Sequence, residues 1–62
     1  MAELHSDVVA LLRQAECRLV RQGKHEIWYS PLTERHFPVP RTIKSRHTAN
    51  AIMRQAGLAK AF

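Results

Sequence analysis

The sequence predicts an α+β domain of order αβββα, in which two helices cover one face of a three-stranded antiparallel sheet. Three observations predict this fold. Apolar residues recur at helical spacing near each end of the chain, β-branched and aromatic residues concentrate between them, and turn-forming residues separate the strands. Packing both helices on one face buries their apolar sides economically. A chain of 62 residues accommodates one such domain, so residues 1–62 are expected to form a single unit.

The first helix is predicted at residues 6–16. Ser6 is a candidate N-cap, and Asp7 places a negative charge in the first turn, where the helix dipole favours it. An apolar stripe at helical spacing follows, made up of Val8, Leu11, Leu12 and Ala15.

Three short strands are predicted in the middle of the chain. They are expected at residues 17–21, 25–30 and 35–40, with a turn at 22–24 and a hairpin loop at 31–34. The third strand contains Pro38 and Pro40, which have no N–H to donate to a neighbouring strand. It is therefore expected at an edge of the sheet.

Pairing Ser30 with Arg35 across the hairpin loop fixes which side chains share a face of the sheet. The side covered by the helices is then expected to carry the pairs Trp28–Phe37 and Glu26–Val39. His25 falls on the opposite, open side, next to the glycine turn, where a large substrate can reach it. The other residues expected on the open side are Ile27, Tyr29, His36, Pro38 and Pro40.

The last helix is predicted at about residues 46–56. Ser45 is its candidate N-cap, and Gly57 is well placed as the residue that stops it. Its apolar stripe consists of Ala49, Ile52, Met53 and Ala56.

The charge of the chain favours an anionic partner. Ten Lys and Arg residues against five Asp and Glu residues give a formal net charge of +5, and every charged residue from Arg35 onward is positive. Such an excess attracts nucleic acid through its field and through counterion release. An acidic partner protein would be attracted equally.

The sequence also bears on compartment and cofactors. Cys17 is the only cysteine, so an internal disulfide is excluded and a reducing compartment is expected. The chain has no apolar run near the roughly 20 residues that cross a bilayer, and its start does not resemble a signal peptide. We therefore expect a cytoplasmic protein with no membrane partner. Its four histidines form no HxxxH pair, which predicts no metal site and no cofactor.

Three blocks follow one another along the chain: a glycine turn that leads into a histidine strand, a Val-Pro strand end, and a helix that closes on Gln-Ala-Gly-Leu. They lie at residues 23–31, at residues 37–41 with 43–44, and at residues 52–58. In this succession, from Val8 through Leu58, the chain resembles the HicA toxins of bacterial type II toxin–antitoxin systems. The resemblance implies an αβββα fold similar to a double-stranded RNA-binding domain. It also implies a ribonuclease that cleaves messenger RNA and is neutralised by a HicB-type antitoxin.

The resemblance also assigns the catalytic residue. The family histidine of the glycine turn maps onto His25. Many members have Gly-Ser-His-His at this point, whereas this chain has Gly-Lys-His-Glu. Histidine suits either proton-transfer role in RNA cleavage, because its pKa lies near neutrality. On the residues alone an exposed histidine is more often incidental than catalytic, so the prediction depends on the resemblance.

The other candidate site residues are predicted to bind RNA. Lys24 is placed to contact the phosphate beside His25, and Tyr29 is placed to stack on a base. Backbone phosphates are the predicted ligands of Arg41, Lys44 and Arg46. His36 is expected about 13 Å from His25 at 3.3 Å per residue, too far to share one phosphodiester, which leaves a single-histidine mechanism. His5 and His47 are expected at the surface.

The sequence is also compatible with two further functions. The chain is alternatively a non-catalytic RNA-binding module in which His25 has no chemical role. It is otherwise one half of a regulatory pair whose basic face docks an acidic protein.

Overall fold

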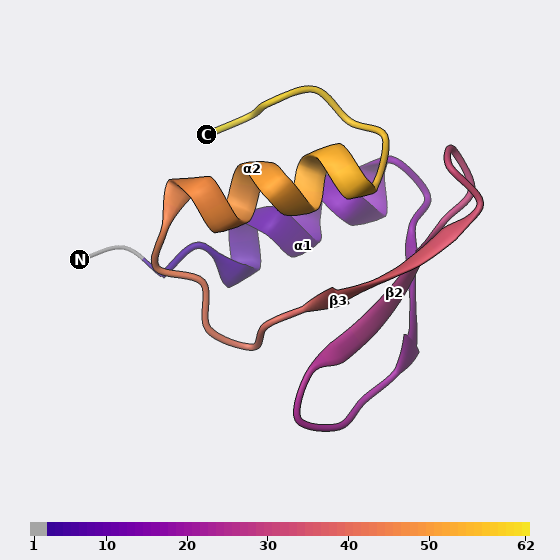
Figure 1. Cartoon of the computed structure of the whole chain (residues 1–62), viewed down its shortest axis with the longest axis horizontal. Helices are drawn as coiled ribbons and strands as arrows, with labels where there is room; N and C mark the ends of the chain where they lie inside the picture. The colour runs from indigo at the N-terminus through magenta and orange to yellow at the C-terminus, as the bar shows by residue number, and fades with distance from the viewer. Residues whose placement is uncertain (1–2) are drawn as a thin grey trace.

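Two parallel helices lie side by side on one face of a three-stranded antiparallel sheet in the computed structural model, which describes residues 3–62 (Figure 1). In chain order the elements are α1 (His5–Gln14), β1 (Arg18–Arg21), β2 (Glu26–Ser30), β3 (Arg35–Val39) and α2 (Arg46–Gln55). The predicted α+β fold of order αβββα is confirmed. Met1 and Ala2, which open the predicted domain, lie outside the described residues. Within residues 3–62 no helix is long and apolar enough to span a membrane.

The start of α1 differs from the prediction. Leu4, and not Ser6, occupies the N-cap position, and no cap side chain forms a hydrogen bond there. The carboxylate of Glu3 instead accepts hydrogen bonds from the backbone N–H groups of His5 and Ile43. This carboxylate accepts from a backbone N–H group that has no partner within the helix. It also lies near the positive end of the helix dipole, which favours a negative charge. The prediction of Ser6 as N-cap is therefore wrong.

The β2–β3 hairpin has the predicted register, with Ser30 opposite Arg35 and Trp28 opposite Phe37. The strand order is β1-β2-β3, so β3 lies at an edge of the sheet, as its prolines require. Trp28 and Phe37 are buried on the side that faces the helices. The hairpin therefore fixes which residues can lie on the open side.

His25 lies outside β2, contrary to the predicted strand at residues 25–30. β1 pairs with β2 only as far as Arg21 opposite Ile27, and the ladder is irregular just before that pair. Such an irregularity bends a strand and disrupts its pairing. Residues 22–25 consequently form the turn between the two strands.

The core lies between the helices and the covered side of the sheet. Trp28 is its largest side chain and is 1% exposed, and the Arg13 guanidinium carbon of α1 lies 5.3 Å from the centre of its ring system. The predicted helical stripes are buried at Val8, Leu12, Ala49, Ile52, Met53 and Ala56. Cys17 is buried, and Ile43 joins the core from the segment before α2.

Both predicted end signals of α2 are confirmed. The Ser45 hydroxyl accepts a hydrogen bond of 3.1 Å from the backbone N–H of His47. Gly57 has a φ of 85°, in the left-handed region that ends helices. A Cβ added to Gly57 would also lie 2.9 Å from Cγ2 of Thr33. Glycine is therefore required there for its backbone conformation and for space.

The β2–β3 loop is tied to the C-terminal end of α2. Ser30 is completely buried, and its hydroxyl donates a hydrogen bond of 2.6 Å to the carbonyl oxygen of Ala56. The Thr33 hydroxyl donates a second, of 3.2 Å, to the carbonyl oxygen of Gln55. These bonds satisfy carbonyl groups that the last turn of a helix leaves without partners.

Candidate functional site

The turn between β1 and β2 carries the predicted catalytic residue. Gly23, Lys24 and His25 are all exposed. In Figure 1 this turn forms the lower end of the molecule, away from both helices. His25 immediately precedes Glu26, the first residue of β2. The imidazole is thus open to a large substrate, as expected, although a turn and not a strand presents it.

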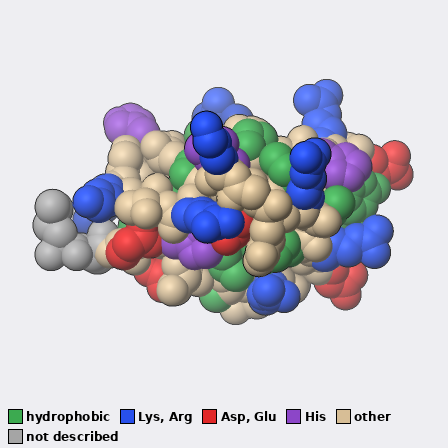
Figure 2. Space-filling view, turned by 90° about the horizontal axis from the view of Figure 1, so that it is seen from below, with side chains coloured by type: hydrophobic (Ala, Val, Ile, Leu, Met, Phe, Trp, Pro, Cys, Tyr) green, Lys and Arg blue, Asp and Glu red, His purple; other side chains and the backbone are tan. Residues whose placement is uncertain are grey.

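Positive charge is spread over this side of the molecule. Seen from below the view of Figure 1, Lys and Arg side chains recur along the whole surface, with histidines among them, whereas acidic side chains gather mainly toward the two ends (Figure 2). Within residues 3–62, the one contact of 4.0 Å or less between a carboxylate and a basic group joins Glu26 to His5. The Lys and Arg side chains of this part of the chain therefore remain available for an external anion.

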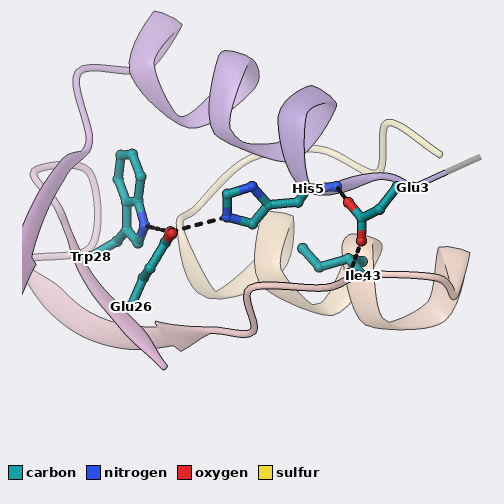
Figure 3. Close-up of polar contacts among 5 residues, drawn as sticks. All are labelled: Glu3, His5, Glu26, Trp28 and Ile43. Carbon is teal, nitrogen blue, oxygen red and sulfur yellow. Dashed lines mark hydrogen bonds and ion pairs between the residues drawn. The ribbon is translucent and has the colours of Figure 1, made fainter. Parts of the chain in front are cut away.

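A partly buried polar cluster fixes the strand end next to His25. Oε1 of Glu26 accepts a hydrogen bond of 2.9 Å from Nε1 of Trp28 and lies 3.1 Å from Nε2 of His5 (Figure 3). The side chains of His5 and Glu26 are 25% and 14% exposed. His5 is therefore not a plain surface residue, contrary to expectation. Through this carboxylate, the start of β2 is held against the start of α1.

The same contacts determine the ionisation of Glu26. Burial alone raises the pKa of a carboxyl group. The hydrogen bonds from Trp28 and His5, with the positive charges of His5 and Arg41, outweigh burial and lower the pKa of Glu26 from its ordinary value. Glu26 is consequently ionised at neutral pH. This carboxylate is suited to anchoring the strand and not to donating a proton.

Arg41 lies at the same corner of the molecule. Val39, the last residue of β3, pairs with Glu26, the first residue of β2, so the chain that leaves β3 passes the chain that enters β2. The positive charge of Arg41 contributes to the lowered pKa of Glu26, which places Arg41 within electrostatic reach of that carboxylate. Of the predicted phosphate contacts, Lys24 precedes His25 directly in the chain, and Arg41 acts electrostatically on Glu26, the residue that follows His25.

The remaining predicted phosphate contacts lie further from the turn. Lys44 and Arg46 are exposed, and Arg46 is the first residue of α2. In Figure 1, the segment that follows β3 runs upward on the left to the start of α2, away from the turn at the lower end of the molecule. The structure therefore does not gather all the predicted phosphate contacts around His25.

Tyr29 lies on the open side of the sheet, as predicted, at the other end of β2. Its ring centroid is 5.0 Å from that of His36 on β3, and the Arg18 guanidinium carbon of β1 lies 5.5 Å from the ring centroid. His36 is directly opposite Tyr29 in the ladder. His36 is therefore displaced along β2 from the turn that carries His25.

The described residues provide no metal centre: within residues 3–62, no group of three or more His, Cys, Asp or Glu side chains is placed to hold an ion. The chemistry that this turn offers is proton transfer by an exposed imidazole, with the positive charge of Lys24 beside it in the chain. Such an arrangement is suited to a reaction at a phosphate.

The contacts of Glu26 were missed in the sequence, although one signal was present. The predicted register placed this carboxylate on the covered side of the sheet, opposite Val39. A carboxylate on a buried face requires donors, which are rarely absent in folded proteins. The donor on α1 is His5, which is 21 positions away from Glu26 in the chain. Its approach to Glu26 depends on how α1 docks on the sheet, which local sequence patterns do not reveal.

Comparison with known families adds to this geometry. The model of a family described as the HicA toxin of bacterial toxin–antitoxin systems matches residues 6–58. That range includes all five elements except His5, the first residue of α1. A search among curated proteins and a search among solved structures gave no match.

Proposed function

The chain belongs to the HicA family of bacterial toxins, and on this basis we propose that it is an endoribonuclease that cleaves messenger RNA without a metal ion. A toxin of such a system has an antitoxin partner, and we propose a HicB-type protein in that role. The observation that carries the proposal is the exposed imidazole of His25, next to Lys24 on a turn whose base is fixed by the contacts of Glu26.

In the proposed reaction, the 2′-oxygen of a ribose attacks the adjacent phosphorus and the 5′-oxygen leaves. The 2′-hydroxyl loses a proton, and the leaving 5′-oxygen gains one. His25 carries out one of these proton transfers, and water supplies the counterpart. Lys24 and Arg41 stabilise the negative charge that develops on the phosphorane. A single histidine acting in this way gives slow turnover, which is sufficient for arresting growth.

The more distant residues serve binding in this proposal. Lys44 and Arg46 contact backbone phosphates, where the N-terminal end of α2 adds its own positive field. Tyr29 contacts a base. The antitoxin inhibits by covering the turn of residues 22–25, and the toxin acts in the cytoplasm, where its messenger RNA substrates are translated.

His25→Ala is the test. The purified variant and the parent are incubated with messenger RNA, and full-length RNA is followed over time, together with growth arrest on expression. We expect cleavage and growth arrest to be lost, while the circular dichroism spectrum and RNA affinity stay close to those of the parent. His47→Ala, at another exposed histidine, is the matched control and retains cleavage. Added EDTA leaves the activity of the parent unchanged.

Two outcomes contradict the proposal. If the His25→Ala protein cleaves as fast as the parent, the catalytic assignment is wrong. If the parent binds RNA but leaves it intact in the absence of the antitoxin, the chain is a non-catalytic RNA-binding module.

A further inference from the structure

We infer that the open side of the sheet holds a base-stacking subsite for single-stranded RNA, formed by Arg18, Tyr29 and His36. This inference rests on the proposed function, because it concerns how the same RNA substrate is held away from the scissile bond. Of the three residues, only Tyr29 was predicted to contact RNA from the sequence. Arg18 and His36, which flank Tyr29, are identified by the strand register and by the distances between the side chains.

The three side chains form one row across the whole sheet. Arg18 on β1 pairs with Tyr29 on β2, and Tyr29 pairs with His36 on β3. The two ring centroids are 5.0 Å apart with planes inclined by 55°, and the guanidinium carbon is 5.5 Å from the tyrosine centroid. Arg18 and His36 are exposed and Tyr29 is half-buried. A base therefore has two exposed planar groups to stack on, held in place by the ring between them.

The charge on this side of the sheet suits RNA. The next row of the open side consists of Arg21, Ile27 and Pro38. Neither row contains a carboxylate: the only acid in the three strands, Glu26, is on the helix side and is occupied by Trp28 and His5. Basic groups interleaved with flat apolar ones are what a single strand requires, since phosphates and bases alternate along it.

A hollow at the edge of β3 extends the row. It has a volume of about 550 Å³ and is lined by Thr33, Arg35, His36, Phe37, Arg54 and Gln55. Within residues 3–62, neither Arg35 nor Arg54 has a carboxylate within 4.0 Å. His36 thus belongs both to the stacking row and to a cavity with two unpaired guanidinium groups. An RNA strand that stacks a base on His36 would meet these groups with its next phosphate.

The position of the row determines what it can affect. Tyr29 is four residues along the chain from His25, about 13 Å in an extended strand. A base at the row is therefore a few nucleotides away from the phosphate at His25. Contacts at this distance bind the substrate and select the cleavage position, but they do not touch the reacting atoms. Their loss raises KM and leaves kcat close to that of the parent.

The experiment measures RNA binding without cleavage. The His25→Ala protein is titrated into a fluorescently labelled single-stranded oligoribonucleotide, and its anisotropy gives Kd. We expect His36→Leu in this background to weaken binding about tenfold, the scale of one stacked base. His36→Phe restores the ring and recovers most of the affinity. Lys60→Ala, which removes an exposed charge beyond α2, changes Kd less than twofold.

Tyr29→Leu provides a second variant, and its binding is compared with that of Tyr29→Phe, which keeps the ring. Because Tyr29 is half-buried, circular dichroism of both variants is recorded, and His36→Leu decides the matter if Tyr29→Leu fails to fold. The inference is overturned if His36→Leu in the His25→Ala background binds the oligoribonucleotide as tightly as the His25→Ala protein does. A loss in His36→Phe as large as in His36→Leu also overturns it, because the ring would then be irrelevant.

Failure of the inference and failure of the proposed function remain distinguishable. If His25→Ala abolishes cleavage while the row variants keep the Kd of the His25→Ala protein, the function stands and the subsite is wrong. If His25→Ala cleaves like the parent, the catalytic proposal falls whatever Kd the row variants give. Row variants that keep RNA affinity but lose the antitoxin identify a protein interface, which also overturns the subsite.

Discussion

At one end of β2, Ser30 is completely buried and its hydroxyl donates to the carbonyl oxygen of Ala56, whereas at the other end the chain emerges into an exposed turn with Lys24 and His25. The first end is tied to α2 by backbone acceptors and by a glycine that leaves no room for a side chain. At the second end, one carboxylate, that of Glu26, holds the strand to α1. The comparison shows how a five-residue strand can join a fixed structural end to an end that is free to meet a substrate.

The largest expected effect is at the tied end, where Gly57→Ala should destabilise the fold by about 2–4 kcal/mol. The new Cβ would lie 2.9 Å from Thr33, and alanine would have to adopt a φ of 85°. Urea unfolding of variant and parent measures the difference. Gly23→Ala is the matched control, because the nearest atom to its Cβ is the His25 carbonyl oxygen at 3.9 Å. Equal losses of stability for the two glycine variants would contradict the difference between the tied end of β2 and its exposed end.

Next in size is Ser30→Ala, with an expected loss of about 1–3 kcal/mol. The substitution removes the hydrogen bond to Ala56 and leaves a carbonyl oxygen unpaired at a buried position. The free energy of unfolding in urea is again the measurement. Ser6→Ala serves as control and should change it by less than about 0.5 kcal/mol, since Ser6 is exposed and does not cap α1. A large effect of Ser6→Ala would reinstate the cap that the sequence predicted.

Glu26→Gln tests the single anchor at the other end, with an expected loss of about 1 kcal/mol at pH 7. The lowered pKa of Glu26 gives this loss a pH dependence. Because the folded state holds its proton less tightly than the unfolded chain, the stabilisation is present above the ordinary pKa of about 4.5 and disappears as the pH falls below it. Unfolding at pH 7 and near pH 3 should therefore show a smaller difference between variant and parent at the lower pH. A difference that grows on acidification contradicts the account.

The smallest expected effect on stability is at the turn itself. Lys24→Ala should change the free energy of unfolding by less than about 0.5 kcal/mol, because the side chain is exposed. Its effect on RNA cleavage should be larger, about tenfold, since it removes charge next to the reacting phosphate. A rate assay beside the urea titration separates the two. If stability falls while cleavage is unchanged, Lys24 belongs to the structure and not to the site.

Much of this arrangement could be predicted from the sequence because it depends on local periodicity. The apolar stripes that include Leu12 and Ile52 identified both helices, and strand alternation with a short loop gave the pairing of Trp28 with Phe37. Gly57 was recognised as a helix stop because few other residues tolerate that backbone conformation.

The rest depends on how elements dock, which local patterns do not encode. The hydrogen bond between His5 and Glu26 joins positions 21 residues apart, and the capping carboxylate of Glu3 also reaches Ile43, 40 residues away. The early end of the β1–β2 ladder, which moves His25 from strand to turn, comes from an irregularity within β1. For the site, sequence reasoning named candidate residues, which stay predictions, and it did not indicate the row that Arg18 and His36 complete.

The central claim is that the free end of β2 is where RNA is cleaved. Its most direct measurement is the rate at which a purified, folded His25→Ala protein cuts messenger RNA, compared with the parent and with His47→Ala under the same conditions. We expect cleavage by the parent and by His47→Ala, and at least a hundredfold slower cleavage by His25→Ala, the lower range of a general acid–base contribution. Cleavage by His25→Ala at the rate of the parent would contradict the assignment of His25 as the catalytic residue.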